Sequence, residues 1–195
     1  MEKEPHYFWA VRIPDDVKQT IHDELTQIQS IFPFKRWVDL NDYHITLAFL
    51  GSVKSQKLSS VISLVGDAIK EQKAFMLDVI GLGVFGAQTF PRIFWGGVSE
   101  VKELYQLQEI VHKTCLAAGF SLDTRPYHPH ITLARKWGGN EGFIMDDLAT
   151  HNPFREKGLS FQVSEVVLYQ SNLENTPKYE AISVFSLADK SKTIL

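Results

Sequence analysis

Apolar positions recur at two different periods along this chain of 195 residues. Spacings of three and four predict helices over residues 15–30, 55–70 and 101–118, with a shorter helix at 142–150. Runs rich in β-branched and aromatic residues predict strands. These strands cover residues 7–13, 42–50, 74–82, 92–98, 129–136, 163–170 and 179–187, and residues 32–38 form a loop or short strand. The mixed order of strands and helices predicts an α+β fold.

One pentapeptide, His-Ile-Thr-Leu-Ala, occurs at residues 44–48 and again at residues 130–134. Read as a strand, each copy places its histidine and threonine on one face and its isoleucine and leucine on the other. The copies lie 86 residues apart, and each follows a long predicted helix. We therefore predict a duplicated unit and a bilobal, pseudo-symmetric fold, with two mainly antiparallel sheets lining a central cleft and helices outside. Because no long linker separates the halves, residues 1–195 are expected to form a single domain of two intertwined lobes.

Two such strands facing each other would bring two imidazoles and two hydroxyls to one point. Histidine has an unperturbed pKa near 6.5, so a neutral and a charged copy can coexist near neutral pH. That pair suits metal-free acid–base chemistry on a phosphate ester, with one imidazole on each side of phosphorus. The residues alone do not say which histidine is the acid and which the base.

Composition and charge narrow the classes of function. The formal net charge of −3 argues against a broad basic surface for duplex nucleic acid. The one cysteine, Cys115, excludes an internal disulfide framework. The first residues are charged rather than apolar, and no run approaches the ~20 apolar residues of a membrane span. We expect a cytoplasmic protein without membrane contact, and a monomer.

Two other motifs have the residue types of a metal site or a cofactor site. His44, His128 and His130 offer three imidazoles for zinc, but only Asp42 adds a nearby carboxylate, and each repeated histidine has a threonine as companion. Residues 81–86 match the GxGxxG spacing of dinucleotide sites. A proline and a strand follow instead of a helix, which predicts a loop or hairpin. We expect neither a metal nor an organic cofactor.

The doubled His-x-Thr-x motif resembles the signature of the 2H phosphoesterases. Residues 43–51, 129–135, 166–171 and 179–187 are most similar to the branch of RNA 2′,3′-cyclic phosphodiesterases, once called 2′-5′ RNA ligases, and the likeness extends over residues 8–187. It implies hydrolysis of RNA 2′,3′-cyclic phosphate ends, or of cyclic nucleotides, to 2′-phosphomonoesters. Joining or cleaving 2′-5′ linkages, a small cyclic-nucleotide phosphodiesterase and a non-catalytic RNA-end-binding module remain as alternatives.

The same resemblance implies roles for six residues. His44 would be the proton donor, His130 the proton acceptor, Thr46 and Thr132 the ligands of the phosphate oxygens, and Phe49 and Arg135 the residues that flank the base. In a regular strand Phe49 and Arg135 have the opposite parity to the histidines. A bulge or a strand end would be needed to turn them toward the site.

Overall fold

The computed structural model describes residues 5–189, and its elements follow the predicted order. The helices are α1 (Asp15–Ile28), α2 (Ser55–Ile69), α3 (Lys102–Ala117) and α4 (Met145–Thr150), with a 3-10 turn η1 (Leu40–Asp42). The strands are β1 (His6–Arg12), β2 (Phe34–Trp37), β3 (His44–Ser52), β4 (Phe75–Gly86), β5 (Pro91–Val98), β6 (His130–Trp137), β7 (Leu159–Val163), β8 (Glu165–Ser171) and β9 (Tyr179–Ser186). The α+β class is confirmed, as are all four predicted helices.

The prediction of two separate sheets is wrong. The described strands form one nine-stranded sheet in the order β7-β4-β5-β6-β3-β1-β8-β9, and β2 pairs with β6 outside this path. The two halves join where Ile45 of β3 pairs with Ile131 of β6. Both isoleucines are fully buried, so packing draws the two repeated strands into direct contact. Beyond that point β2 pairs with β6, from Trp37 opposite Ala134 to Phe34 opposite Trp137.

Two strand boundaries also differ from the predictions. The predicted strand 163–170 is broken at Ser164 into β7, which pairs with β4, and β8, which pairs with β1. The chain therefore crosses from one half of the sheet to the other within a single apolar run. The glycines of residues 81–86 extend β4 to Gly86, which pairs with Pro91 in an antiparallel hairpin. The loop or hairpin predicted at this motif is thus a hairpin between β4 and β5.

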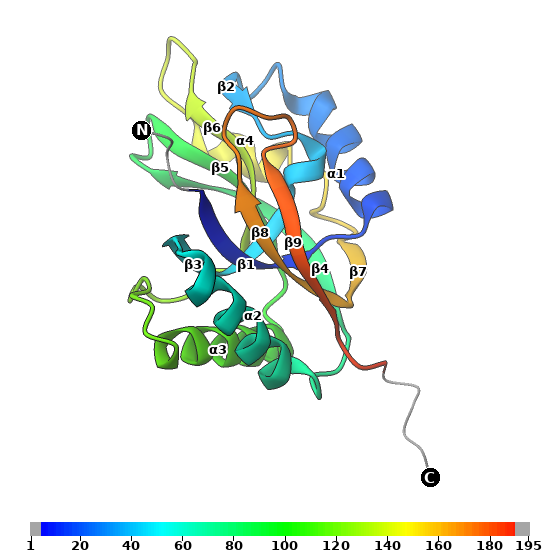
Figure 1. Cartoon of the computed structure of the whole chain (residues 1–195). Helices are drawn as coiled ribbons and strands as arrows, with labels where there is room; N and C mark the ends of the chain where they lie inside the picture. Colours follow the sequence, from blue (N-terminus) through cyan, green and yellow to red (C-terminus); the bar gives the residue numbers. More distant parts are fainter. Residues whose placement is uncertain (1–4, 190–195) are drawn as a thin grey trace.

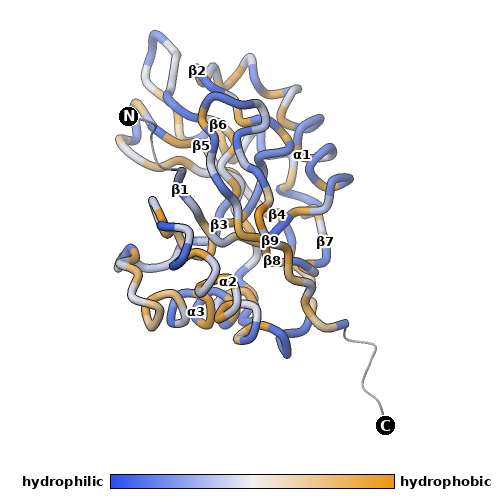
Figure 2. The backbone as a smooth tube through the Cα atoms, viewed as in Figure 1, coloured by the Kyte–Doolittle hydropathy of each residue, from blue (hydrophilic) through white to orange (hydrophobic). Residues whose placement is uncertain are grey.

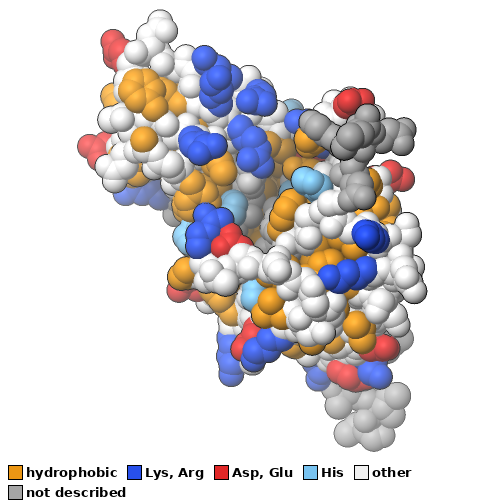
Figure 3. Space-filling model, turned by 60° about the vertical axis from the view of Figure 1, so that its left-hand side comes forward, with side chains coloured by type: hydrophobic (Ala, Val, Ile, Leu, Met, Phe, Trp, Pro, Cys, Tyr) orange, Lys and Arg blue, Asp and Glu red, His pale blue; other side chains and the backbone are white. Residues whose placement is uncertain are grey.

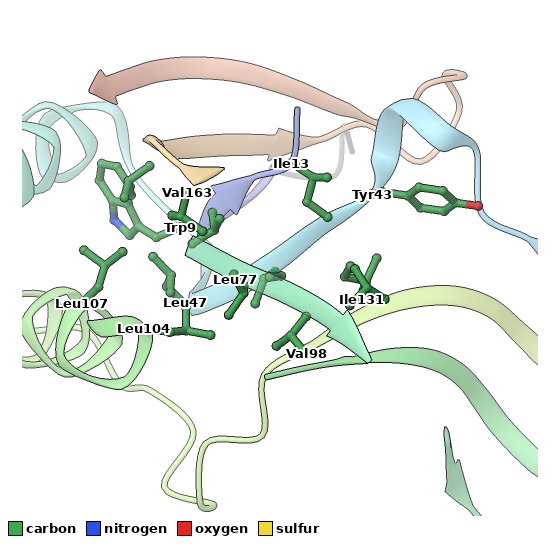
Figure 4. Close-up of a cluster of buried hydrophobic side chains, with 14 of the residues drawn as sticks. Trp9, Ile13, Tyr43, Leu47, Leu77, Val98, Leu104, Leu107, Ile131 and Val163 are labelled. Atoms are coloured by element: carbon green, nitrogen blue, oxygen red, sulfur yellow. The ribbon is translucent and has the colours of Figure 1, made fainter. Parts of the chain in front are cut away.

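Helices cover the sheet and complete the core. In Figure 1, α2 and α3 lie together below β1 and β3, while β5, β6 and β2 occupy the upper part. Leu104 and Leu107 of α3 lie beside Leu47 of β3 in the buried cluster of Figure 4, and all three side chains are buried. Burying a leucine side chain stabilises the fold by roughly 1.5–3 kcal/mol. These contacts fix β3 against α3 through the buried face of the strand.

The surface elements are polar by comparison. Figure 2 shows hydrophilic residues along outer turns of α1 and in the loop between β8 and β9. Within residues 5–189, no helix is both long and apolar enough to cross a membrane.

Candidate active site

The two repeated pentapeptides lie against each other at the centre of the sheet, and their side chains divide as the parity predicted. The isoleucine and leucine of each copy are buried. The histidine and threonine of each copy stay partly exposed on the opposite face; these are His44, Thr46, His130 and Thr132. The structure thus gathers both imidazoles and both hydroxyls on one side of the junction between the halves.

Each of the two histidines is held by the same local hydrogen bond. Nδ1 of His44 lies 2.6 Å from the carbonyl oxygen of Asp42, and Nδ1 of His130 lies 2.7 Å from that of His128. A carbonyl oxygen only accepts, so Nδ1 carries the proton in both rings. Nε2 is left with a lone pair in the neutral form. In His44 that Nε2 lies 3.1 Å from Oγ1 of Thr46, whose hydroxyl donates to it.

Aromatic rings restrain both imidazoles. The rings of Phe8 and Tyr179 lie with their centroids 4.8 Å and 5.1 Å from that of His44. Phe85 stands edge-on to His130 at 5.0 Å. Such contacts limit rotation of each imidazole. They therefore keep Nε2 in the orientation that the hydrogen bond from Nδ1 to the backbone carbonyl fixes.

A third histidine lies beside His130. The ring of His128 packs 5.0 Å from Trp95 and 6.3 Å from His130. Trp95 fits there because residue 83 is glycine, since a Cβ on Gly83 would meet the indole at 2.2 Å. The zinc site considered above is not formed, because no group of three potential metal ligands occurs among the described residues 5–189.

Burial and neighbouring charges make both histidines weak bases. Burial is the main cause that lowers the pKa of His44 to about 4, and the positive charges of His130, Arg135 and Lys18 add to it. The pKa of His130 is lowered too, first by burial and then by His128 and Arg135. Both rings are therefore neutral at pH 7 in the free protein. An anion bound between them would raise both pKa values, because it favours the imidazolium.

Bulges resolve the parity problem of Phe49 and Arg135. In both repeats the neighbouring strand skips the leucine of the pentapeptide, so that Leu47 and Leu133 are the extra residues. The following alanine is buried along with the leucine, which shifts the alternation by one and exposes Phe49 and Arg135. The Arg135 side chain hydrogen-bonds that of Tyr179 and lowers the pKa of both repeated histidines. Phe49 lies farther out, 52% exposed, with its ring edge-on to His6 at 5.8 Å.

Asp42 has a structural role that the sequence analysis did not assign. Its buried carboxylate accepts the backbone N–H of Lys178 at 2.9 Å and that of Tyr179 at 3.0 Å. Burial raises the pKa of this carboxyl, and the two backbone N–H groups oppose that shift. Because Asp42 also bonds His44 through its carbonyl, one residue positions both the histidine and the Tyr179 ring beside it. The sequence offered one indication of this role. Asp42 precedes His44 by two positions, just as His128 precedes His130 by two positions.

A cavity of about 770 Å³ adjoins the second repeat. Phe85, which contacts His130, is one of its walls, and Arg135 is another. Arg36 and Arg92 also line it, and nothing in the sequence around Arg92 indicated a role for that residue. Figure 3 shows Lys and Arg side chains gathered on one lobe beside a hollow in which histidine side chains are visible.

Comparison with known proteins places this geometry in context. The family described as LigT-like phosphoesterase matches the chain twice, at residues 13–95 and again at residues 97–179, so the duplication extends to the family pattern itself. An RNA 2′,3′-cyclic phosphodiesterase of Geobacillus stearothermophilus is 44% identical over 185 residues, which are 95% of this chain and 58% of that protein. The chain thus spans less than two thirds of that relative.

Two further similarities cover nearly full lengths. An RNA 2′,3′-cyclic phosphodiesterase of Bacillus subtilis (strain 168) is 35% identical over 184 residues, 94% of this chain and 97% of that protein. The crystal structure of Escherichia coli LigT complexed with 3′-AMP superposes with a TM-score of 0.78 at 26% identity, over 95% of this chain and 99% of that one.

Proposed function

Because the chain belongs to the LigT-like phosphoesterase family, we propose that it hydrolyses RNA 2′,3′-cyclic phosphate ends to 2′-phosphomonoesters. The observation that carries the proposal is the pair His44 and His130, each with Nδ1 bonded to a backbone carbonyl, which leaves the lone pair of Nε2 as the position that exchanges a proton. The curated names of the relatives support the substrate class, and 3′-AMP bound to the Escherichia coli protein supports a ribonucleotide 3′ end as the group that binds.

The proposed reaction is an in-line displacement without a metal. Nε2 of His130 takes a proton from water as the water oxygen attacks phosphorus. The bond between phosphorus and the ribose 3′ oxygen breaks, and Nε2 of His44 gives its proton to that oxygen. The products are a 2′-phosphate and a 3′-hydroxyl. Acid–base assistance of this kind contributes about 10²–10⁴-fold to a rate.

Binding of the substrate prepares the acid. His44 is neutral in the free protein, because burial and nearby cations lower its pKa to about 4. The phosphodiester anion offsets those cations and favours a proton on Nε2. Thr46 and Thr132 are proposed to hydrogen-bond the non-bridging oxygens. Phe49, from its exposed position, and Arg135 are proposed to flank the base, and Arg135 also supplies a positive charge near the phosphate.

Product analysis tests this function. Incubation with adenosine 2′,3′-cyclic phosphate in EDTA should yield adenosine 2′-phosphate, which chromatography separates from the 3′ isomer. The 3′ isomer as the product would refute the proposed direction of bond cleavage. Activity that EDTA abolishes and zinc or manganese restores would refute the metal-free mechanism.

The same assay separates the alternatives. A 2′-5′ ligase would join the cyclic phosphate end to an added RNA with a 5′-hydroxyl. A small cyclic-nucleotide phosphodiesterase would hydrolyse adenosine 3′,5′-cyclic phosphate at a comparable rate. An RNA-end-binding module would bind the 2′,3′-cyclic end without turnover.

A further inference from the structure

The cavity beside His130 has the composition of a site for single-stranded nucleic acid. Four cationic side chains line it, and no acidic residue does; the four are Arg36, Arg92, Arg135 and Lys136. None of them forms an ion pair with any residue of the described range 5–189. This excess of positive charge stands out in a chain whose net charge is −3.

The backbone brings these cations together at a cost. Arg36 of β2 stands directly opposite Arg135 of β6 in the antiparallel ladder. Like charges at such positions repel and destabilise the pair. Lys136 follows with a φ of 64°, in the left-handed region that few residues other than glycine adopt. A bound anion between these side chains would offset the repulsion, which is how phosphate-binding surfaces use clustered cations.

Aromatic side chains line the cavity together with the cations. Phe85, Phe90 and Trp137 line the same cavity, and Phe90 is 55% exposed. Exposed rings beside cations form stacking platforms for unpaired bases, whereas the bases of a duplex are already stacked on one another. The combination therefore favours a single strand over a duplex.

We propose that this cavity binds the single-stranded RNA immediately 5′ of the cyclic phosphate. The inference rests on the proposed function and names the substrate as an oligonucleotide rather than a free cyclic nucleotide. A 2′,3′-cyclic phosphate ends the chain, so only upstream nucleotides extend away from the histidines. Phe85 and Arg135 belong both to the cavity and to the surroundings of His130, which makes the path continuous. The cavity volume of about 770 Å³ lies within the 300–1,000 Å³ range of small-ligand pockets.

The test is the ratio of kcat/KM for a tetranucleotide with a 2′,3′-cyclic end to kcat/KM for adenosine 2′,3′-cyclic phosphate. We expect a ratio of about 5 or more, because stacking one base is worth about 1–3 kcal/mol, or roughly 5- to 150-fold. The tetranucleotide should also show the steeper salt dependence, by about −0.7 in log–log slope for each added phosphate contact. A ratio near one, or an RNA hairpin with a blunt duplex end that is an equally good substrate, would overturn the proposal.

Variants locate the effect in the cavity. Arg92→Gln should reduce the ratio about threefold to tenfold and flatten the salt slope by about 0.7. Phe90→Ala should reduce the ratio by at least about fivefold. Lys157→Gln removes the same charge from an exposed residue outside the cavity and should leave the ratio unchanged. An unchanged ratio in Arg92→Gln, or an equal loss in Lys157→Gln, would overturn the proposal.

Direct binding separates this proposal from the proposed function. Fluorescence anisotropy of a labelled tetranucleotide ending in a 3′-phosphate measures occupancy of the cavity without turnover. Should neither substrate be hydrolysed, the proposed function fails, while weaker binding by Arg92→Gln than by Lys157→Gln still supports the cavity as the strand site. Equal binding by both variants refutes it.

Discussion

Asp42→Ala is expected to loosen the protein and its active site together. The change removes the acceptor of the backbone N–H groups of Lys178 and Tyr179, and the side chain it deletes is almost wholly buried. Leaving a fully buried donor unpaired costs about 1–3 kcal/mol. These two bonds are part-buried and water can enter the gap, so the two donors together cost about 2–4 kcal/mol. For a chain of this length, 1 kcal/mol shifts Tm by roughly 2–4 °C, and the expected fall is therefore about 5–15 °C.

Activity should fall as well, because Asp42 sets the position of the Tyr179 ring against His44. A displacement of about 1 Å at a catalytic group can cost up to 10²-fold, so we expect kcat to fall about 10- to 100-fold at a temperature where the variant is folded. Asp42→Asn keeps an oxygen that both N–H groups can reach, and it should recover about half of the lost stability. Thermal unfolding followed by circular dichroism and the hydrolysis assay measure the two effects.

Asp67→Ala provides the control, since it removes an equal charge from an exposed position on α2. Its Tm and kcat should match those of the unchanged protein. An Asp42→Ala variant with a Tm within about 1 °C of the original would show that the hairpin loop between β8 and β9 does not depend on this carboxylate. Reduced stability with unchanged kcat would show that the position of Tyr179 does not affect catalysis.

Four further results are expected of the active site. His44→Ala and His130→Ala should each lower kcat by about 10²–10⁴-fold without unfolding the protein, and retention of a third of kcat by either would refute the two-histidine mechanism. Thr46→Val and Thr132→Val should lower kcat/KM, at about 1.5–3 kcal/mol for each hydrogen bond to the anion, while a fall in Tm alone would show purely structural threonines. Because the pKa of both histidines is lowered in the free protein, kcat/KM should decline as pH rises, with a midpoint below pH 6.5. The midpoint of the kcat profile should lie higher, because the bound anion raises both pKa values. A plateau of kcat/KM that extends above pH 7 would contradict this. Prolonged dialysis against EDTA should leave kcat unchanged, and a loss restored by metal would refute the metal-free reaction.

The sequence itself determined the order of the helices and strands. It also determined which side chains of the repeated strands are buried and which are exposed. Helical and strand periods are local, so apolar spacing alone located α1, α2 and α3 within a few residues. Parity within each pentapeptide separated the buried isoleucine and leucine from the exposed histidine and threonine. The repeat also carried the family resemblance, because its residue types combine packing and chemistry within five positions.

Tertiary structure decided how these elements meet. Pairing of Ile45 with Ile131 joins the two halves into one sheet, and the break at Ser164 sends one apolar run to two different partner strands. Strand pairing joins residues far apart in the chain, so no local period encodes it. The bulges that expose Phe49 and Arg135 arise from the register with neighbouring strands.

The same holds for residues whose role depends on distant partners. Asp42 bonds a loop 136 residues away, and Arg92 lines one cavity with Arg135 and Arg36 only because β5, β6 and β2 are adjacent in the sheet. Their side chains carry no local pattern that separates them from ordinary surface charges. The long-range antiparallel pairing alone places a carboxylate under the loop beside His44 and gathers four cations beside His130.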